Sequence, residues 1–318
     1  MSMSTDRISS TTVGSETPTL RRFYFHGLGG TLFGIQIVNL FLGLLTLGVY
    51  SFWGRVKVRK YMMSQTEFEG DRFAYHGTGK ELLIGWVKAA VIIGIPFIIL
   101  TLLSVGALTY VIVAAFMPVA VVSARRYRLS RSSWRGIRFS FRGRVWDFAW
   151  LSAKGWLLTA VTFGIAYPIW QSWRQCFLVS HSYWGNKSFE FHGRASELLW
   201  PFLLHLLLAL PTLGLCWFWY GARAQRYYWN HTHFGEARFN SSVTGCGLFA
   251  LMLSNLFLLI VTLGFAWSWV QARNARYYLG HLTLAGPIDV AGIVQDAQAA
   301  TATGEALSAF FDFDFDLG

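Results

Sequence analysis

The stretch TLGFAWSWVQARNARYY, residues 262 to 278, contains the pattern on which the chain is built. An apolar run reaches Thr-Leu-Gly, a Trp follows seven residues after the Thr, and the sequence then becomes basic and aromatic. TLGVYSFWGRVKVRKY at residues 46 to 61 and TLGLCWFWYGARAQRYY at residues 212 to 228 repeat the same order. Three copies indicate that the chain consists of repeated units.

A second marker, the aromatic motif Phe-x-Phe-x-Gly with some variation, gives the length of the unit. Its copies begin at Phe23, Phe73, Phe139, Phe189 and Phe239, so the starts differ by 50, 66, 50 and 50 residues. We therefore predict five units within residues 21 to 286: residues 23–72, 73–138, 139–188, 189–238 and 239–286. Residues 1 to 20 are rich in Ser and Thr and are predicted to be disordered, and residues 287 to 318 form an acidic tail.

The composition places the repeated part of the chain in a membrane. Hydrophobic residues make up 54% of the sequence and charged residues 14%, whereas an ordinary soluble domain has about 25% charged residues. Several segments approach the roughly 20 apolar residues that cross a bilayer: residues 28–53, 82–103, 105–123, 145–170, 198–220 and 246–270. The sequence thus predicts an all-α, multi-pass membrane domain of about six transmembrane helices, with short strand-like Phe-x-Phe-x-Gly segments and interfacial basic helices.

Two topologies remain open at this stage. If each unit crosses the membrane once and the second unit twice, equivalent basic helices lie on opposite sides of the membrane. If the Thr-x-Gly sequence instead breaks a re-entrant helix pair, every unit begins and ends on the same side. The sequence does not decide between them.

The charge distribution favours lipid over nucleic acid as the partner. The net charge is +11, yet six of the sixteen acidic residues lie after residue 286, so the body of the chain is more basic than the total. Basic residues that flank apolar segments are typical of topology signals and of contacts with anionic phospholipid headgroups. We expect the bilayer itself as the partner, with a membrane protein as a further candidate.

The motifs resemble those of a known family. TLGVYSFWGRVKVRKY, followed by Thr66, Gly70 and RFAYHGTGKELLIG at residues 72 to 85, is similar to the YjgN-like family of bacterial inner-membrane proteins, a domain of unknown function. The similarity covers roughly residues 20 to 286, and the third unit departs most, with IAYPIW at residues 165 to 170. The resemblance implies location in the bacterial cytoplasmic (inner) membrane and no established activity.

Polar residues inside the apolar segments are the first candidate site. Ionisable groups within a membrane are costly and often functional, but they also form interfacial ion pairs or hydrogen bonds between helices. The acidic residues lie at the start of the segments, and the others lie within them. The candidates are Glu81, Asp147, Glu197, His205, Asn39, Asn255 and Lys154.

The basic and aromatic segments are the second candidate site. Basic residues spaced by three face the same way on a helix, and a Tyr follows each of them, which suits the phosphate groups of anionic lipids. Simple anchoring is the alternative explanation, although residues 125 to 138 are more basic than anchoring requires. The candidates for contact with lipid or another anion are Lys57, Lys60, Arg126, Arg226, Arg276, Tyr61, Tyr127, Tyr227 and Tyr277.

No catalytic, metal or cofactor motif accompanies these residues, so we expect neither a cofactor nor a metal ion. Gly77-Thr-Gly79-Lys80 lacks the first Gly of a phosphate loop and its Ser or Thr. Three functions remain: transport of a small or anionic solute, a non-catalytic scaffold or lipid-binding protein, and an intramembrane enzyme centred on His205. The tail FFDFDFDLG is predicted to be disordered or to add a strand to a sheet edge.

Overall fold

The computed structural model of the chain describes residues 20–95, 97–98, 106–288 and 292–295. The predicted N-terminal segment therefore lies outside the described residues except for Leu20, which begins a strand. The Phe-Asp tail also lies outside them.

Ten short antiparallel strands form a closed barrel in the order β1, β10, β9, β8, β7, β6, β5, β4, β3, β2. Each described strand pairs on both sides, so the barrel offers no free edge of the kind considered for the tail. The strands are β1 (Leu20–Phe25), β2 (Thr66–Phe68), β3 (Asp71–Tyr75), β4 (Ser132–Trp134), β5 (Ile137–Phe141), β6 (Ser182–Trp184), β7 (Lys187–Phe191), β8 (Thr232–Phe234), β9 (Ala237–Ser241) and β10 (Leu282–Ala285).

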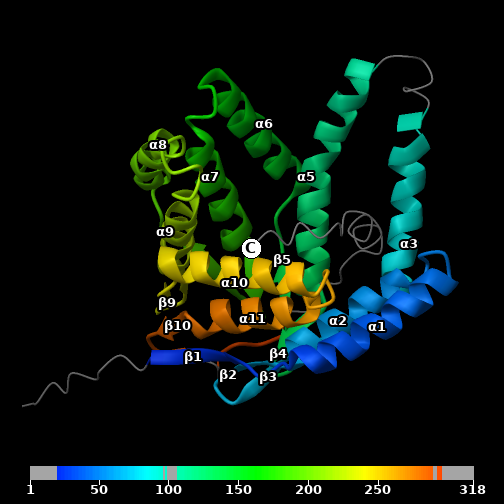
Figure 1. Cartoon of the computed structure of the whole chain (residues 1–318). Helices are drawn as coiled ribbons and strands as arrows, with labels where there is room; N and C mark the ends of the chain where they lie inside the picture. The colour runs from blue at the N-terminus through cyan, green and yellow to red at the C-terminus, as the bar shows by residue number, and fades with distance from the viewer. Residues whose placement is uncertain (1–19, 96, 99–105, 289–291, 296–318) are drawn as a thin grey trace, which may run out of the picture.

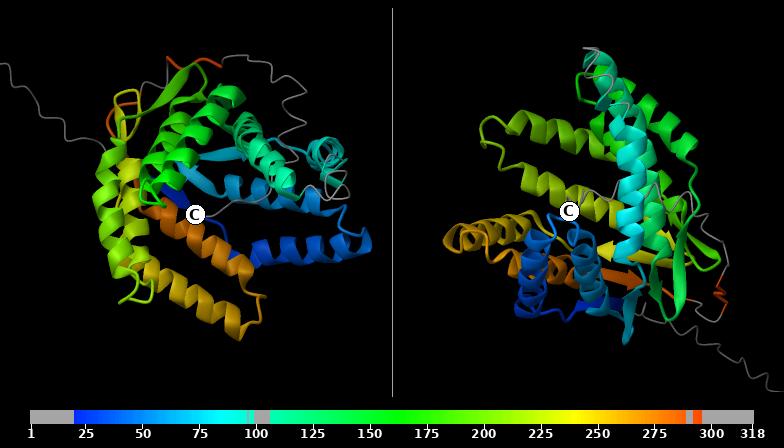
Figure 2. Two further views of the ribbon diagram at one scale, coloured as in Figure 1. Left: turned by 90° about the horizontal axis from the view of Figure 1, so that it is seen from above. Right: turned by 90° about the vertical axis from the view of Figure 1, so that its right-hand side faces the viewer.

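Between the two strands of each unit the chain forms a pair of helices, and these helical hairpins fan out from the barrel (Figures 1 and 2). In the second unit the link between the helices falls partly outside the described residues. The helices are α1 (Gly29–Leu45), α2 (Ser51–Ser64), α3 (Gly79–Ala89) with the π-helical turn η1 (Ala90–Gly94), α5 (Gly106–Ser130), α6 (Val145–Val161), α7 (Tyr167–Ser180), the 3-10 turn η2 (Ala195–Leu198) with α8 (Leu199–Leu208), α9 (Trp217–Asn230), α10 (Gly245–Val261) and α11 (Trp267–Gly280).

The barrel interior is filled by one aromatic layer that repeats from unit to unit. The first Phe of each Phe-x-Phe-x-Gly motif stands opposite a large apolar residue at the end of the next strand. These cross-strand pairs are Phe23 with Phe68, Phe73 with Trp134, Phe139 with Trp184, Phe189 with Phe234, and Phe239 with Leu284. Ring centroids of Trp134 and Trp184 are 4.8 Å apart, and those of Phe23 and Phe68 are 4.3 Å apart. Aromatic pairs at these distances stabilise beyond the area they bury.

Tight turns set the register of the barrel. Glu69 and Gly70 connect β2 to β3, and both have positive φ angles, 52° and 82°. Two residues of this conformation match the twist of the strands that they join.

A small hydroxyl side chain begins the second strand in four units and donates to the helical carbonyl four residues earlier. Examples are Ser132 to Arg128 O at 2.8 Å and Ser182 to Leu178 O at 2.7 Å. The hydroxyl thus joins the end of each hairpin to the barrel.

The prediction of an all-α, multi-pass protein with about six transmembrane helices is wrong. The strand-like motifs belong to a closed barrel, and the long apolar segments divide into shorter helices. Residues 145–170, for example, form α6 and α7, which the turn at Thr162 separates. Among the described helices, none is both long and apolar enough to cross a membrane. The alternative of a helix pair broken at Thr-x-Gly matches the observed path of the chain, because each unit begins and ends in the barrel.

Candidate functional site

The tips of four helical hairpins are the most exposed apolar part of the described chain. The middle residue of each Thr-x-Gly sequence has a φ angle between 48° and 51°. Its side chain is 88 to 96% exposed. These residues are Leu47, Phe163, Leu213 and Leu263. A large side chain in this left-handed region is uncommon and costs conformational energy. The fold therefore holds four apolar side chains outward at an energetic cost.

The Thr and Gly on either side of the tip residue build the turn. The hydroxyl of Thr262 donates to Leu258 O at 2.7 Å, and the same bond occurs at Thr46, Thr162 and Thr212. Gly264 has a φ angle of 89°, which suits a residue without a side chain. The hydroxyl satisfies a carbonyl at the helix end while the chain reverses. This turn, predicted only as a break, is what places the apolar residue at the tip.

Further apolar and aromatic side chains are exposed along the hairpins near these tips. Leu45, Leu210 and Val261 are among the exposed aliphatic residues. Exposed tryptophans lie farther from the tips, at Trp146, Trp150, Trp200, Trp219, Trp267 and Trp269. Lys154, one of the predicted residues, lies exposed on α6 with its Nζ 5.0 Å from the Trp150 ring. Contiguous exposed apolar surface marks a site that contacts another protein or a membrane.

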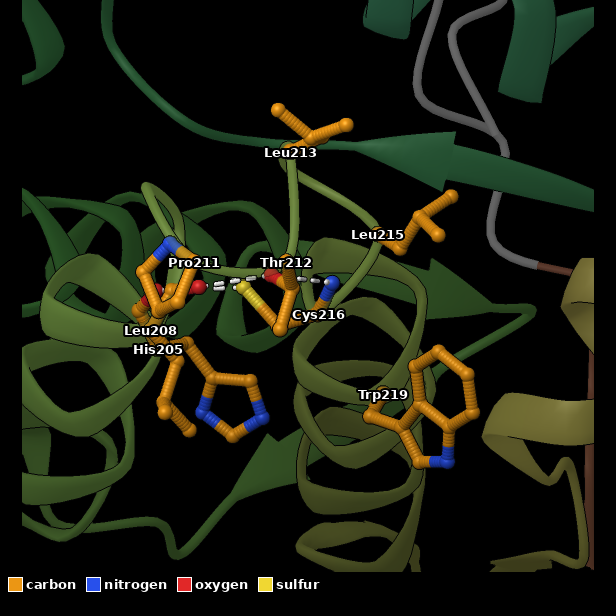
Figure 3. Close-up of a pocket in the computed structure, with 8 residues that line it drawn as sticks. All are labelled: His205, Leu208, Pro211, Thr212, Leu213, Leu215, Cys216 and Trp219. Carbon is orange, nitrogen blue, oxygen red and sulfur yellow. Dashed lines mark hydrogen bonds between the residues drawn. The ribbon is translucent and has the colours of Figure 1, made fainter.

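The tip of the fourth hairpin contains a cleft of about 620 Å³. Figure 3 shows His205 and Trp219 on opposite sides of it, with Thr212 and Cys216 between them. The Nδ1 of His205 donates to Pro201 O at 2.6 Å, and the thiol of Cys216 donates to His205 O at 3.2 Å. These partners are the backbone of the same hairpin. His205 thus has one ring nitrogen engaged in the structure of its own helix.

The other polar residues predicted within the apolar segments also bond inside their own hairpins. Asn39 donates to Gly54 O at 3.2 Å, which joins α1 to α2. Asn255 donates to Asn274 Oδ1 at 2.8 Å, which joins α10 to α11. Within the described residues no hydrogen bond connects Asn39, His205 and Asn255 to one another. The structure therefore does not gather them into one polar path.

The three predicted acidic residues occupy equivalent places at the starts of helices but have different partners. Glu81 accepts from the Tyr127 hydroxyl at 3.1 Å and pairs with Arg131 at 3.1 Å, and it also caps α3 together with Thr78. Glu197 lies 3.8 Å from His231. Asp147 is exposed in the first turn of α6. Glu81 thus forms an ion pair of the kind considered as the structural alternative, with an Arg and a Tyr of its own unit.

The basic residues of the second helices connect neighbouring units at two places. Arg126 donates to Gly143 O at 2.8 Å, and Arg276 donates to Gly27 O at 3.0 Å. Both acceptors are the Gly of the next Phe-x-Phe-x-Gly motif around the barrel. On α2, Lys57 bonds to the Tyr50 hydroxyl at 2.6 Å, and Lys60 is exposed. Arg226 is half-buried on α9.

The Tyr that follows each basic residue contacts the beginning of its own hairpin. Leu28 N donates to the Tyr61 hydroxyl at 2.8 Å, and the Tyr227 hydroxyl donates to Arg194 O at 2.6 Å. Burial raises the pKa of Tyr227 to about 12, with a further contribution from Glu197. The Tyr277 hydroxyl lies against Gly247, where a β-carbon would come within 2.3 Å of it. The predicted Tyr residues thus join the two ends of their own hairpins, while Arg126 and Arg276 bond to the neighbouring unit.

The sequence interpretation missed the tip residues and Arg174 on α7, although it singled out the basic residues 125 to 138. The sequence contains a signal for the tip residues, because an apolar residue stands between Thr and Gly in four units. The second strand of each unit also had one, because an aromatic or Leu residue recurs 45 residues after the first Phe, or 61 in the second unit.

Comparisons with known proteins agree with the inner-membrane resemblance. The Escherichia coli K12 protein named Inner membrane protein YjgN is 29% identical over 150 residues, which cover 46% of this chain and 37% of that protein. The Salmonella typhimurium protein of the same name is 31% identical over 124 residues, which cover 37% of this chain and 30% of that protein. The matched regions thus span about a third of the length of these curated relatives. No solved structure matches the chain significantly.

A family-level comparison covers far more of the chain. The sequence profile described as "Bacterial protein of unknown function (DUF898)" matches residues 20–218 and 196–310. These matches include every unit of the repeat and extend into the acidic tail. The chain therefore belongs to this family.

Proposed function

We propose that this chain is a non-catalytic membrane-binding protein of the bacterial inner membrane, which inserts the tips of its helical hairpins into lipid. The observation that carries the proposal is the set of four tip residues, 88 to 96% exposed, which the fold holds outward in a strained conformation. The names of the curated relatives support the same location. In this proposal the barrel is the scaffold that carries the hairpins.

The order of residues along a hairpin fits insertion without crossing. In the fifth hairpin, Leu263 at the tip is followed by Trp269 after six residues and by Arg273 after ten. At 1.5 Å per helical residue these lie roughly 9 Å and 15 Å from the tip. The hydrocarbon core is about 30 Å thick, so its half is about 15 Å. A tip near the bilayer centre would place the Trp in the outer part of the hydrocarbon and the Arg at its boundary with the headgroup region.

Transport has no comparable support. The barrel interior of the described residues is occupied by the aromatic layer of Phe and Trp side chains, and the predicted polar residues bond within separate hairpins. Lipid binding and scaffolding are therefore the functions that the geometry supports best.

Vesicle flotation tests the proposal. In the variant Leu47→Ser, Phe163→Ser, Leu213→Ser and Leu263→Ser, the four tips lose their apolar side chains. Burying one such side chain contributes about 1.5 to 3 kcal/mol, so we expect binding to vesicles of phosphatidylethanolamine and phosphatidylglycerol to weaken by on the order of 100-fold or more. The matched control is Leu20→Ser with Leu28→Ser, two exposed leucines at the barrel end of the hairpins. Equal binding of the tip variant and the unchanged protein would refute tip insertion.

A further inference from the structure

Three arginines on α5 and α7 lie in the second and third units. Two of them, Arg128 and Arg174, have no basic equivalent in the other units, whereas Arg59 stands at the place of Arg125 in the first unit. Arg125 and Arg128 lie one turn apart on α5, and Arg174 lies on α7. The residues that replace Arg174 in the other units are Val58, Ala124, Ala224 and Asn274. The group is therefore not required by the repeated architecture, and it needs a separate explanation.

A hydrogen bond places Arg125 at the junction of the hairpins and the barrel. The Nη2 of Arg125 donates to Ser182 Oγ at 3.4 Å, and Ser182 Oγ donates to Leu178 O at 2.7 Å. Arg174 precedes Leu178 by four residues and lies on the same face of α7. Ser182 is two residues from Trp184, so both face the interior of the barrel. Arg125 thus lies where the barrel interior opens towards the helices. Arg128 and Arg174 are its electrostatic neighbours, and the guanidinium of Arg174 lies 6.0 Å from the centre of the Trp170 ring.

The environment of Arg125 is unfavourable for a lone cation. Its Nε is enclosed and, within the described residues, has no hydrogen-bond partner. Burial lowers the pKa of Arg125 to about 10, with further contributions from the positive charges of Arg128 and Arg174. Burial also lowers the pKa of Arg174. Enclosed charges are normally compensated by an opposite charge, because their transfer from water is costly.

The described carboxylates do not supply that charge. Six of them pair with cationic or imidazole groups elsewhere, and Asp147 and Glu236 are exposed. The pairs are Glu67 with His26, Glu69 with Arg21, Asp71 with Arg135, Glu81 with Arg131, Glu190 with His192, and Glu197 with His231. No ion pair of Arg125 or Arg174 with a carboxylate occurs among the described residues.

Neutral donors stand beside the cations. Tyr167 and Tyr228 are electrostatic neighbours of Arg174. Burial raises the pKa of Tyr228 to about 12, so its hydroxyl keeps its proton at neutral pH and remains a hydrogen-bond donor. Guanidinium forks together with hydroxyl donors are the groups that recognise the oxygens of a phosphate.

We propose that Arg125 and Arg174, with Arg128 beside them, form a binding site for a phosphate group at the helix end of the barrel. The phosphate comes either from a free phosphate ion or from an anionic phospholipid headgroup, since both present the same oxygens. The site does not depend on insertion of the hairpin tips.

Binding of inorganic phosphate to the full chain in zwitterionic detergent tests this site by calorimetry, in a chloride buffer. The variant Arg125→Gln with Arg174→Gln removes both forks, and we expect its affinity for phosphate to fall at least about tenfold. The control variant, Arg72→Gln with Arg144→Gln, removes two exposed arginines and should bind as the unchanged protein does. Parallel titrations with phosphatidylglycerol and phosphatidylcholine in mixed micelles identify the source of the phosphate.

Thermal unfolding keeps the test decisive if the double variant is poorly folded. The variant Arg125→Lys with Arg174→Lys retains the charge but loses the planar forks. Phosphate should raise the Tm of the unchanged protein and of the Arg72 control, and it should raise that of the Lys variant less. Phosphate affinity and Tm shifts that are equal in all variants would overturn the site, as would failure of the unchanged protein to bind either phosphate or phosphatidylglycerol. Flotation of the Gln variant on vesicles of phosphatidylcholine alone, which lack an anionic headgroup, should equal that of the unchanged protein, which separates this site from the tips.

Discussion

The barrel and the hairpin tips use the same kind of residue in opposite ways. In the barrel, Phe and Trp side chains from all units bury one another, and Trp184 is 3% exposed. At the tips, Leu and Phe side chains stand almost fully outside, and Leu263 is 88% exposed. The apolar side chains of the barrel bury one another within the chain. Those at the tips stay exposed to water unless another apolar phase covers them. The contrast teaches that the same residue types form a buried core in one region and an exposed apolar surface in the other.

Shortening Trp184 to Ala should produce the largest loss of stability. The Trp184 ring packs 4.8 Å from that of Trp134 and 5.7 Å from that of Phe234, and its Nε1 donates to Ile137 O at 3.2 Å. A cavity in such a core costs about 3 to 5 kcal/mol in the free energy of unfolding. The matched change Leu263→Ala at a tip should cost less than about 0.5 kcal/mol. Denaturant unfolding in detergent measures both, and equal losses would remove the distinction between the two regions.

A change where a hairpin joins the barrel should cost less stability than the Trp184→Ala change and more than the Leu263→Ala change. Glu81→Gln removes the ion pair with Arg131 and weakens the acceptor for the Tyr127 hydroxyl. We expect a loss of about 1 to 2 kcal/mol in the free energy of unfolding. Asp147→Asn, at the equivalent place in the third unit but exposed, should cost about 0.5 kcal/mol or less. A larger loss at Asp147 than at Glu81 would contradict the assignment of the ion pair.

The smallest expected effect is a dependence of stability on pH at the outer surface of the barrel. Burial lowers the pKa of His233 below its ordinary value, and the His192 ring, 4.7 Å away, and Arg238 add to the decrease, which the backbone bond to His231 opposes. Glu190 stands opposite His233 in the strand register. The unfolded chain therefore binds more protons at His233 than the folded chain near pH 6.

The stability associated with neutral His233 is thus present above about pH 6.5, the unfolded value, and is lost as the pH falls through the folded pKa. Melting curves between pH 8 and pH 5 should show a steeper fall in Tm for the unchanged protein than for His233→Gln. Parallel curves for the two proteins would show that His233 does not contribute.

Particular residues show where prediction from sequence succeeded. The spacing of Phe23, Phe73, Phe139, Phe189 and Phe239 identified the strand-like motifs. The break at Thr-x-Gly was also recognised, with a helix pair as one of two alternatives. The acidic candidates were placed at the starts of the apolar segments, and Glu81, Asp147 and Glu197 each lie in the first turn of a helix. Their different partners depend on contacts between elements that lie far apart in the chain.

The sequence by itself determined the repeat, the strand motifs, the apolar helices and the positions of the turns, because these depend on local spacing and on the conformations of Gly and Thr. The closed barrel was decided only in the tertiary structure. Three-residue strands such as Ser182–Trp184 have almost no local signal, and they exist because hydrogen bonds to two neighbours and the shared aromatic layer stabilise them together. The same closure brings Arg125 of the second unit to Ser182 of the third. A local pattern can therefore fix each unit, while the contacts between units arise only when the ring closes.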